Sequence, residues 1–252
     1  MMKPVQSLAA LVLLGAALLP ARARAGEVSV AVAANFTAPA KQLAAGFQMR
    51  TGNTLVLSFG ASGTFAAEIV EGAPFEVFLS ADQDRPRKLA AAGLAVRGSE
   101  FTYAIGKLAL YSAKPGFVDA KGRVLSRGNF AHIAIADPKT APYGAAALQT
   151  LNALGLSARL APKIVRGKDI SQTYQFVATG NAELGFIALS QVIHAKGGSQ
   201  WLVPAGDYQP IRQDAVLLAA GAKDPAATAF LDYLKSPAAQ AIIRSYGYAT
   251  SP

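Results

Sequence analysis

The 252-residue sequence contains no cysteine and only two histidines, His132 and His194. Without cysteine there can be no disulfide, no thiolate metal ligand and no cysteine nucleophile. The sequence also lacks a G-x-x-x-x-G-K-[S/T] phosphate loop and any histidine spacing typical of a metal site. The loop around Ser62 resembles a G-x-S-x-G nucleophile elbow, but Thr64 stands where the second glycine should be. We therefore predict no enzymatic activity, no cofactor and no metal centre, with an exported hydrolase as a remote alternative.

Clusters of like charge are absent as well. The formal net charge is +9, and it falls to +6 without Lys3, Arg22 and Arg24. The remaining basic residues are scattered, without a run of five or six and without interleaved aromatic residues. Proteins that bind nucleic acids usually gather such residues on one face, so we expect no nucleic-acid partner. A basic balance suits a small anionic ligand, although it does not select one.

Long apolar runs are scarce. The run at residues 8–19 follows Lys3 and is too short to span a bilayer comfortably. It precedes Ala23-Arg24-Ala25, which places small residues at both positions that signal peptidase reads. We therefore predict a signal peptide over residues 1–25, cleaved after Ala25, and an exported mature chain. An N-terminal membrane anchor is the alternative.

Strand and helix patterns alternate along the mature chain, which predicts an α/β fold with largely parallel strands. Apolar runs at residues 28–33, 55–59, 75–79, 132–136 and 184–188 are typical of strands. Apolar residues at helical spacing follow most of them and end at glycines such as Gly52 and Gly155. The strand at residues 184–188 is predicted to lead into a helix at about 189–195. The apolar stretch at residues 101–112 is predicted to be one long strand that crosses from one domain to another. A second, weaker crossing is predicted near residues 210–216.

Four strand-to-helix junctions carry small or polar residues: 33–36, 60–63, 141–144 and 168–171. Ligands in open α/β sheets bind beyond the carboxyl ends of the strands, where helix N-termini offer unpaired N–H donors. Gly60 and Gly63 would let a ligand approach the backbone. Asn35, Ser62 and Tyr143 could add side-chain donors. Taken together, the four junctions predict an anion site without lysine or arginine.

Each of these residues also has a simpler structural interpretation. Ser62 and Asn35 could be helix N-caps, and Asp169 is expected to be one. Tyr143 could cover a helix end, and Ile170 would offer only its backbone N–H. No single position is specific, so the prediction rests on all four junctions.

Several stretches together resemble the periplasmic molybdate-binding proteins of ABC importers. They are VAVAANF, LSFGASGTFAAEIVEGAPFEVFLSAD, FTYAIGKLALYSAKPG, HIAIADPKTAPYG, AELGFIALSQVI and YLKSPAAQAIIRSYGY. The likeness covers nearly the whole mature chain and is most specific at GAPFEVFLSAD. It implies two lobes joined by crossing strands, each a mostly parallel sheet flanked by helices. We place the first lobe at residues 26–105 with 212–252, and the second at 106–211.

The resemblance also implies the ligand and its contacts. The ligand would be molybdate or tungstate, bound by Ala34, Asn35, Ser62, Tyr143 and Ile170. One form of the family has a serine in the place of Asn35 and a tyrosine in the place of Ala188. This chain matches the other form, which has the asparagine and a tyrosine in the P-Y-G turn. The implied partner is the importer's membrane permease, and the implied location is the periplasm, with a monomeric protein.

Neutral donors suit this ligand for a chemical reason. Molybdate and tungstate are fully ionised near neutral pH, so their site needs hydrogen-bond donors and no acceptor. Phosphate keeps a proton over much of that range, and a site that recognises it needs an acceptor such as an aspartate carboxylate. A site without buried cations can also reopen without leaving a charge unpaired. Sulfate has similar donor demands, so a binding protein for sulfate, phosphate or another small anion stays open as the alternative.

Overall fold

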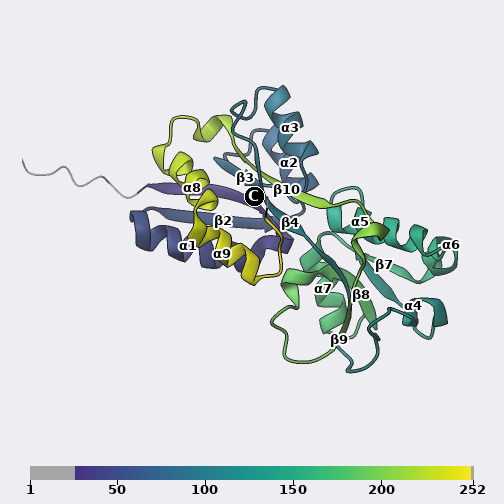
Figure 1. Cartoon of the computed structure of the whole chain (residues 1–252). Helices are drawn as coiled ribbons and strands as arrows, with labels where there is room; N and C mark the ends of the chain where they lie inside the picture. The colour runs from purple at the N-terminus through teal and green to yellow at the C-terminus, as the bar shows by residue number, and fades with distance from the viewer. Residues whose placement is uncertain (1–25, 251–252) are drawn as a thin grey trace, which may run out of the picture.

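The computed structural model describes residues 26–250, which form two five-stranded sheets flanked by helices (Figure 1). The predicted signal peptide lies outside the described residues. We call the first sheet with its helices the first lobe, and the second sheet with its helices the second lobe. Within residues 26–250, none of the helices combines the length and the apolar character needed to cross a membrane.

The first sheet has the strand order β2-β1-β3-β10-β4. Its strands are β1 Glu27–Ala33, β2 Thr54–Gly60, β3 Val77–Leu79, β4 Phe101–Gly106 and β10 Ile211–Leu217. Its helices are α1 Thr37–Thr51, α2 Ser62–Val70, α3 Asp84–Ala91, α8 Pro225–Lys235 and α9 Pro237–Ser245, with the short 3-10 helices η1 Ala34–Phe36 and η5 Ala219–Gly221. The first lobe thus takes its elements from both ends of the chain, and in Figure 1 the purple and yellow segments lie together.

The second sheet has the strand order β7-β6-β8-β5-β9. Its strands are β5 Leu108–Ser112, β6 Ile133–Ala136, β7 Ile164–Gly167, β8 Leu184–Ala188 and β9 Ser199–Leu202. Its helices are α4 Val124–Arg127, α5 Pro142–Ala153, α6 Ser157–Leu160 and α7 Ile170–Ala178, with 3-10 helices η2 Ala161–Lys163, η3 Leu189–Gln191 and η4 Ala205–Asp207. The predicted two-lobed α/β architecture is therefore confirmed.

The sheets are mixed rather than mostly parallel. β1 runs parallel to β2 and β3, but β10 is antiparallel to both β3 and β4. In the second sheet, β6 runs parallel to β7 and β8, whereas β5 is antiparallel to β8 and β9. Two strands at the crossings between the lobes cause this difference, because β10 in the first sheet and β5 in the second each run against the other four strands of their sheet.

Alternation along the central strands divides the first lobe's core into two layers. In β1, Val28, Val30 and Val32 face one cluster with Phe36 and Phe47, whereas Ala31 faces the opposite cluster. This follows from the two-residue period of side chains along a strand. Both faces are apolar because helices cover both, which explains why the strand reads as a continuous apolar run.

Three element predictions need correction. The stretch at residues 101–112 is two strands, because the chain leaves the first sheet after Gly106 and joins the second at Leu108, with Lys107 exposed between them. The strand predicted at residues 75–79 is confined to β3, Val77–Leu79. The helix predicted from residue 189 to 195 is only the 3-10 turn η3, which ends at Gln191.

Candidate functional site

All five predicted ligand residues line one small cavity between the lobes. Its lining consists of Ala33, Ala34, Asn35, Gly60, Ala61, Ser62, Ala81, Ala141, Pro142, Tyr143, Asp169 and Ile170. The four predicted junctions therefore meet at one place, two from each lobe. The volume open to the centre of a water molecule is about 10 Å3. This is about the space that one water molecule needs, and too little for an organic cofactor.

A larger, solvent-open cleft of about 430 Å3 lies beside this cavity. The two share Ala81 and Pro142, but the cleft is lined mainly by charged and amide side chains such as Asp82, Arg85 and Arg212. It contains none of the five predicted ligand residues. We therefore take the smaller cavity as the candidate site and the cleft as its approach.

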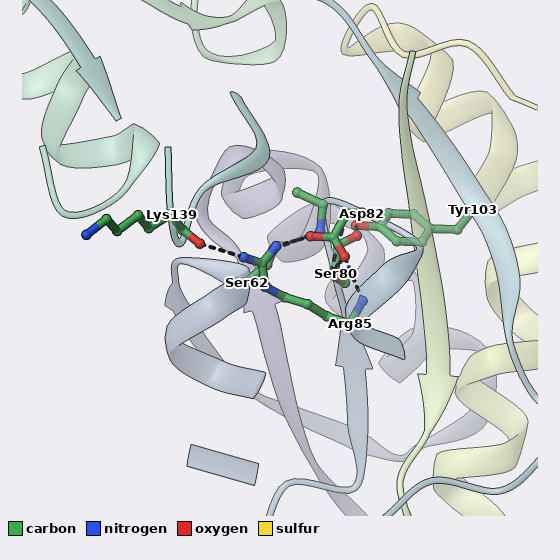
Figure 2. Close-up of polar contacts among 7 residues, drawn as sticks. Ser62, Ser80, Asp82, Arg85, Tyr103 and Lys139 are labelled. Carbon is green, nitrogen blue, oxygen red and sulfur yellow. Dashed lines mark hydrogen bonds and ion pairs between the residues drawn. The ribbon is translucent and has the colours of Figure 1, made fainter. Parts of the chain in front are cut away.

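Ser62 is the first residue of α2 and is fully buried. The N-cap of this helix is Ala61, and no side chain caps it, so Ser62 is not the N-cap that the alternative interpretation expects. Instead, the Ser62 Oγ accepts a hydrogen bond from the Ala81 N–H at 2.9 Å. Figure 2 shows Ser62 beside the turn that follows β3. That bond fixes the hydroxyl as an acceptor on one side and leaves its hydrogen free to donate to a ligand.

Asn35 also differs from a capping residue. It lies inside η1, and its Nδ2 donates to Gln213 Oε1 at 2.9 Å and to the Tyr248 hydroxyl at 3.0 Å. Both amide hydrogens are therefore already used within the protein. The arrangement leaves the backbone of η1, rather than the Asn35 amide group, to meet a ligand.

The Tyr143 phenol points into the same network. Its oxygen accepts a hydrogen bond from Gln213 Nε2 at 3.2 Å, and the residue is almost fully buried. Burial raises the pKa of Tyr143 well above its ordinary value, with a further rise from the nearby Tyr248 phenol. The phenol is therefore neutral at physiological pH. Tyr143 is also the second residue of α5, where a backbone N–H has no acceptor within the helix.

Ile170 opens α7, and the preceding Asp169 is its N-cap, as predicted. The Asp169 carboxylate accepts a hydrogen bond from the Gln172 N–H at 2.8 Å. This leaves the N–H groups of Ile170 and Ser171 at the helix start without an intrahelical acceptor. Asp169 is the only charged residue in the cavity lining, and its bond to Gln172 occupies one carboxylate oxygen.

At both loop glycines a side chain would meet other parts of the protein. A Cβ on Gly60 would meet the Phe65 ring at 3.2 Å. A Cβ on Gly63 would lie 2.8 Å from the Thr140 Cα, and the Gly63 N–H donates to the Thr140 carbonyl at 2.9 Å. Gly63 therefore lets the second lobe approach the first.

Sequence reasoning missed the polar network behind the cavity. The Tyr248 hydroxyl lies 2.8 Å from the Asn35 carbonyl oxygen and 3.0 Å from Ser190 Oγ, and Ser190 Oγ donates to that carbonyl at 2.8 Å. Asn35, Gln213 and Tyr248 belong to the first lobe, whereas Ser190 and Tyr143 belong to the second. No local motif marks Gln213 or Ser190, although Tyr248 lies in the Gly-Tyr tail that the resemblance includes. The network holds η1 in place by neutral hydrogen bonds from both lobes.

The electrostatics of the cavity suit an oxyanion rather than a metal ion. No lysine or arginine is among the residues that line it. Throughout residues 26–250, no group of three or more His, Asp or Glu side chains could hold a metal ion. What the cavity offers is a hydroxyl and several helix-start N–H groups, each with the partial positive charge of a helix N-terminus.

Comparisons with known proteins agree with this geometry. A family model described as "Bacterial extracellular solute-binding protein" matches residues 28–249. The chain is 59% identical to the molybdate-binding protein ModA of Rhodobacter capsulatus, over 90% of each chain. It is 57% identical to the molybdate-binding protein ModA of Azotobacter vinelandii, over 94% of this chain and 95% of that protein.

The fold comparison gives the same result. The solved structure of the Azotobacter vinelandii periplasmic molybdate-binding protein matches with a TM-score of 0.87 and 45% identity, covering 89% of this chain and 100% of that one. The family consists of solute-binding proteins, which confirms the prediction of a binding protein rather than an enzyme. The chain belongs to the bacterial extracellular solute-binding proteins, the family that includes these molybdate-binding proteins.

Proposed function

We propose that this protein captures molybdate, and tungstate in the same way, between its two lobes and delivers it to the membrane permease of an ABC importer. The observation that carries the proposal is the convergence of four helix starts on one small cavity without a cation. The close relatives named as molybdate-binding proteins support the choice of ligand.

The donors follow from the site geometry. The Ser62 hydroxyl donates to one ligand oxygen, because its acceptor side is already occupied by the Ala81 N–H. Backbone N–H groups at Ala34, Asn35, Ser62, Tyr143 and Ile170 supply the other hydrogen bonds. Both amide hydrogens of Asn35 are taken by Gln213 and Tyr248, and the Tyr143 oxygen accepts from Gln213 Nε2. We propose that these two side chains position the donors, in place of the side-chain donors predicted from the sequence.

Neutral donors allow both tight capture and release. A dianion buried against N–H groups forms strong charge-assisted hydrogen bonds. When it leaves, no buried cation is left unpaired, so reopening the lobes does not carry that cost. The single carboxylate in the lining is engaged as a helix cap, which disfavours a protonated ligand such as hydrogen phosphate.

Several further features belong to the same proposal. The mature protein starts after Ala25, acts in the periplasm and is a monomer. Its first lobe comprises residues 26–105 with 212–252, and its second comprises 106–211. The positions at which β4 gives way to β5 and at which β10 begins support these boundaries.

Isothermal titration calorimetry of the purified mature protein tests the function. We expect tight binding of molybdate and tungstate, with sulfate and phosphate bound at least about 100-fold more weakly, which corresponds to about 2.8 kcal/mol. A sulfate affinity equal to that for molybdate would instead favour the alternative, a general binding protein for small anions. If none of the four anions gave a heat of binding or stabilised the protein, the proposed function and the alternative would both be refuted.

A further inference from the structure

A second set of contacts joins the lobes at the rim of the cavity, away from the buried network. The Gly63 N–H donates to the Thr140 carbonyl at 2.9 Å, and Arg85 Nη2 donates to the neighbouring Lys139 carbonyl at 2.9 Å. Gly63 and Arg85 belong to the first lobe, whereas Lys139 and Thr140 precede α5 in the second. We call these four residues with Asp82 the interlobe latch; Figure 2 labels Asp82, Arg85 and Lys139 of this group.

Arg85 is held in place from its own lobe. The Asp82 carboxylate accepts from Arg85 Nη1, and its Oδ1 also accepts the Arg85 backbone N–H at 2.9 Å. Asp82 is tied in turn to Ser80, whose hydroxyl lies 3.4 Å from Asp82 Oδ1 and accepts from the Asp82 N–H at 3.3 Å. The guanidinium therefore offers one nitrogen to its own lobe and the other to the opposite lobe, as a planar fork can.

The latch is coupled to the ligand site through the turn after β3. Ala81, between Ser80 and Asp82, donates its N–H to the Ser62 Oγ, so one turn positions both the ligand donor Ser62 and the latch residue Arg85. In Figure 2 the chain of dashed lines runs from the Lys139 carbonyl through Arg85 to Asp82. Arg85 is absent from the residues that line the small cavity. Its role is therefore separate from ligand contact.

The missing side chain of Gly63 fits the same interpretation. A Cβ at this position would lie 2.8 Å from the Thr140 Cα and 3.0 Å from Arg85 Nη2. The backbone of Thr140 cannot give way as a flexible side chain can, so only glycine lets the two loops meet while Arg85 passes beside them. Both latch bonds need the lobes to be closed, because each joins one lobe to the other.

We propose that Arg85, held by Asp82, is a positioning residue that keeps the lobes closed through the Lys139 carbonyl and so slows release of the bound anion. An interaction made only in the closed state shifts the equilibrium toward that state by its own free energy. Because Asp82 compensates the charge of Arg85 at the rim, the effect falls on release rather than on attraction of the anion. This role rests on the proposed function for its effect on release, but the lobe closure itself can be measured without a ligand.

Stopped-flow kinetics with molybdate separates the latch from a simple charge effect. We expect Arg85→Gln to release molybdate about 3- to 30-fold faster, as the loss of one partly exposed charge-assisted hydrogen bond implies, with an association rate within about 2-fold of wild type. Arg87→Gln is the matched control, because it removes the same charge from an exposed position two residues along α3. Equal effects of the two substitutions, or no effect of Arg85→Gln, would overturn the proposal.

Two further variants test the geometry of the latch. Arg85→Lys keeps the charge but lacks the fork, so we expect it to release molybdate faster than wild type; wild-type release would show that charge alone matters. Gly63→Ala should accelerate release as well, with an unchanged circular dichroism spectrum showing that the chain still folds. Wild-type release by Gly63→Ala would count against the latch.

A distance measurement tests closure without ligand. The chain has no cysteine, so spin labels can be placed at Val70→Cys and Leu154→Cys, two exposed positions on different lobes. In double electron–electron resonance, we expect Arg85→Gln to shift the distances toward longer values and Arg87→Gln to leave them unchanged. If wild type bound no molybdate but Arg85→Gln still opened the lobes, the proposed function would fail and the latch would stand. Unchanged distances in Arg85→Gln would refute the latch even if molybdate bound.

Discussion

At the scale of single residues, Ser62 carries a hydroxyl whose hydrogen is free to donate into the cavity. Its oxygen is fixed by the Ala81 N–H at 2.9 Å, which points its hydrogen elsewhere. We expect Ser62→Ala to raise the Kd for molybdate about 5- to 150-fold, the loss of one buried, charge-assisted hydrogen bond. Calorimetry measures this, with Ser126→Ala on the exposed surface of α4 as the control. Unchanged affinity would show that the Ser62 hydroxyl does not contact the anion.

Substitution of Tyr143 should lower the stability of the protein and leave its affinity for molybdate nearly unchanged. Tyr143→Phe removes the acceptor of Gln213 Nε2 and leaves a buried amide unpaired, so we expect the free energy of unfolding to fall by about 1–3 kcal/mol. The backbone N–H stays, so the Kd for molybdate should change less than about 5-fold, well below the effect of Ser62→Ala. Thermal denaturation and calorimetry on the same sample measure both. A large loss of affinity would show that the Tyr143 hydroxyl contacts the anion.

The buried phenols of Tyr143 and Tyr248 also determine how the stability of the protein depends on pH. Burial raises the pKa of Tyr248 to about 12 and that of Tyr143 well above its ordinary value of about 10. Because their folded pKa values are raised, these groups contribute stability fully below pH 10 and lose it as the pH rises toward the folded values. We therefore expect a constant molybdate affinity from about pH 7 to pH 9. Calorimetry at several pH values checks this, and a fall within that range would mean that a titrating group contacts the ligand.

The sequence predicted residues that lie together at the cavity, but it did not predict the hydrogen bonds that they make within the protein. Asn35 and Ser62 follow parallel strands of the first sheet, and Tyr143 and Ile170 lie at the helix starts after parallel strands of the second, so each pair's proximity follows from local pattern. The meeting of the two pairs in one cavity depends on how the lobes pack, which local pattern does not record. The partners of Asn35 lie 178 and 213 residues away in the chain. Local spacing holds no record of such contacts, so the sequence could not indicate that the Asn35 amide bonds to Gln213 and Tyr248.

At the scale of elements, the N-cap of α7 places a negative charge in the cavity lining. Asp169→Asn keeps a good capping side chain and removes a negative charge from the cavity lining. We expect the free energy of unfolding to change by less than about 0.5 kcal/mol and the molybdate affinity to rise about 2- to 10-fold, because a like charge near the dianion is lost. Asp224→Asn is the control, since Asp224 caps α8 far from the cavity. Weaker binding by Asp169→Asn alone would show that the carboxylate assists the ligand.

The predicted elements differ from the observed ones mainly where the chain passes between lobes. Residues 101–112 are apolar on both sides of Lys107, and a single polar residue does not by itself end a strand, so they were predicted as one strand although Lys107 separates β4 from β5. The direction of β10 depends on its pairing with β3 and β4, and neither pairing has a local signal. Strand-to-helix alternation, by contrast, repeats locally, and the βαβ units around β1 and β6 were predicted from it.

At the scale of the whole molecule, a ligand that contacts both lobes should stabilise the protein as a unit. Such a ligand binds only the folded, closed chain, so it raises the free energy of unfolding by about 2.7 kcal/mol at a concentration 100 times its Kd. For a chain of this size we expect the Tm to rise by about 5–10 °C with molybdate or tungstate, as 1 kcal/mol corresponds to about 2–4 °C. Differential scanning calorimetry measures the shift, with equal concentrations of sulfate and of chloride as controls. A single transition that moves upward indicates that both lobes are joined by the anion. A shift confined to one of two separate transitions would show that the anion binds one lobe alone, contrary to a site built from both.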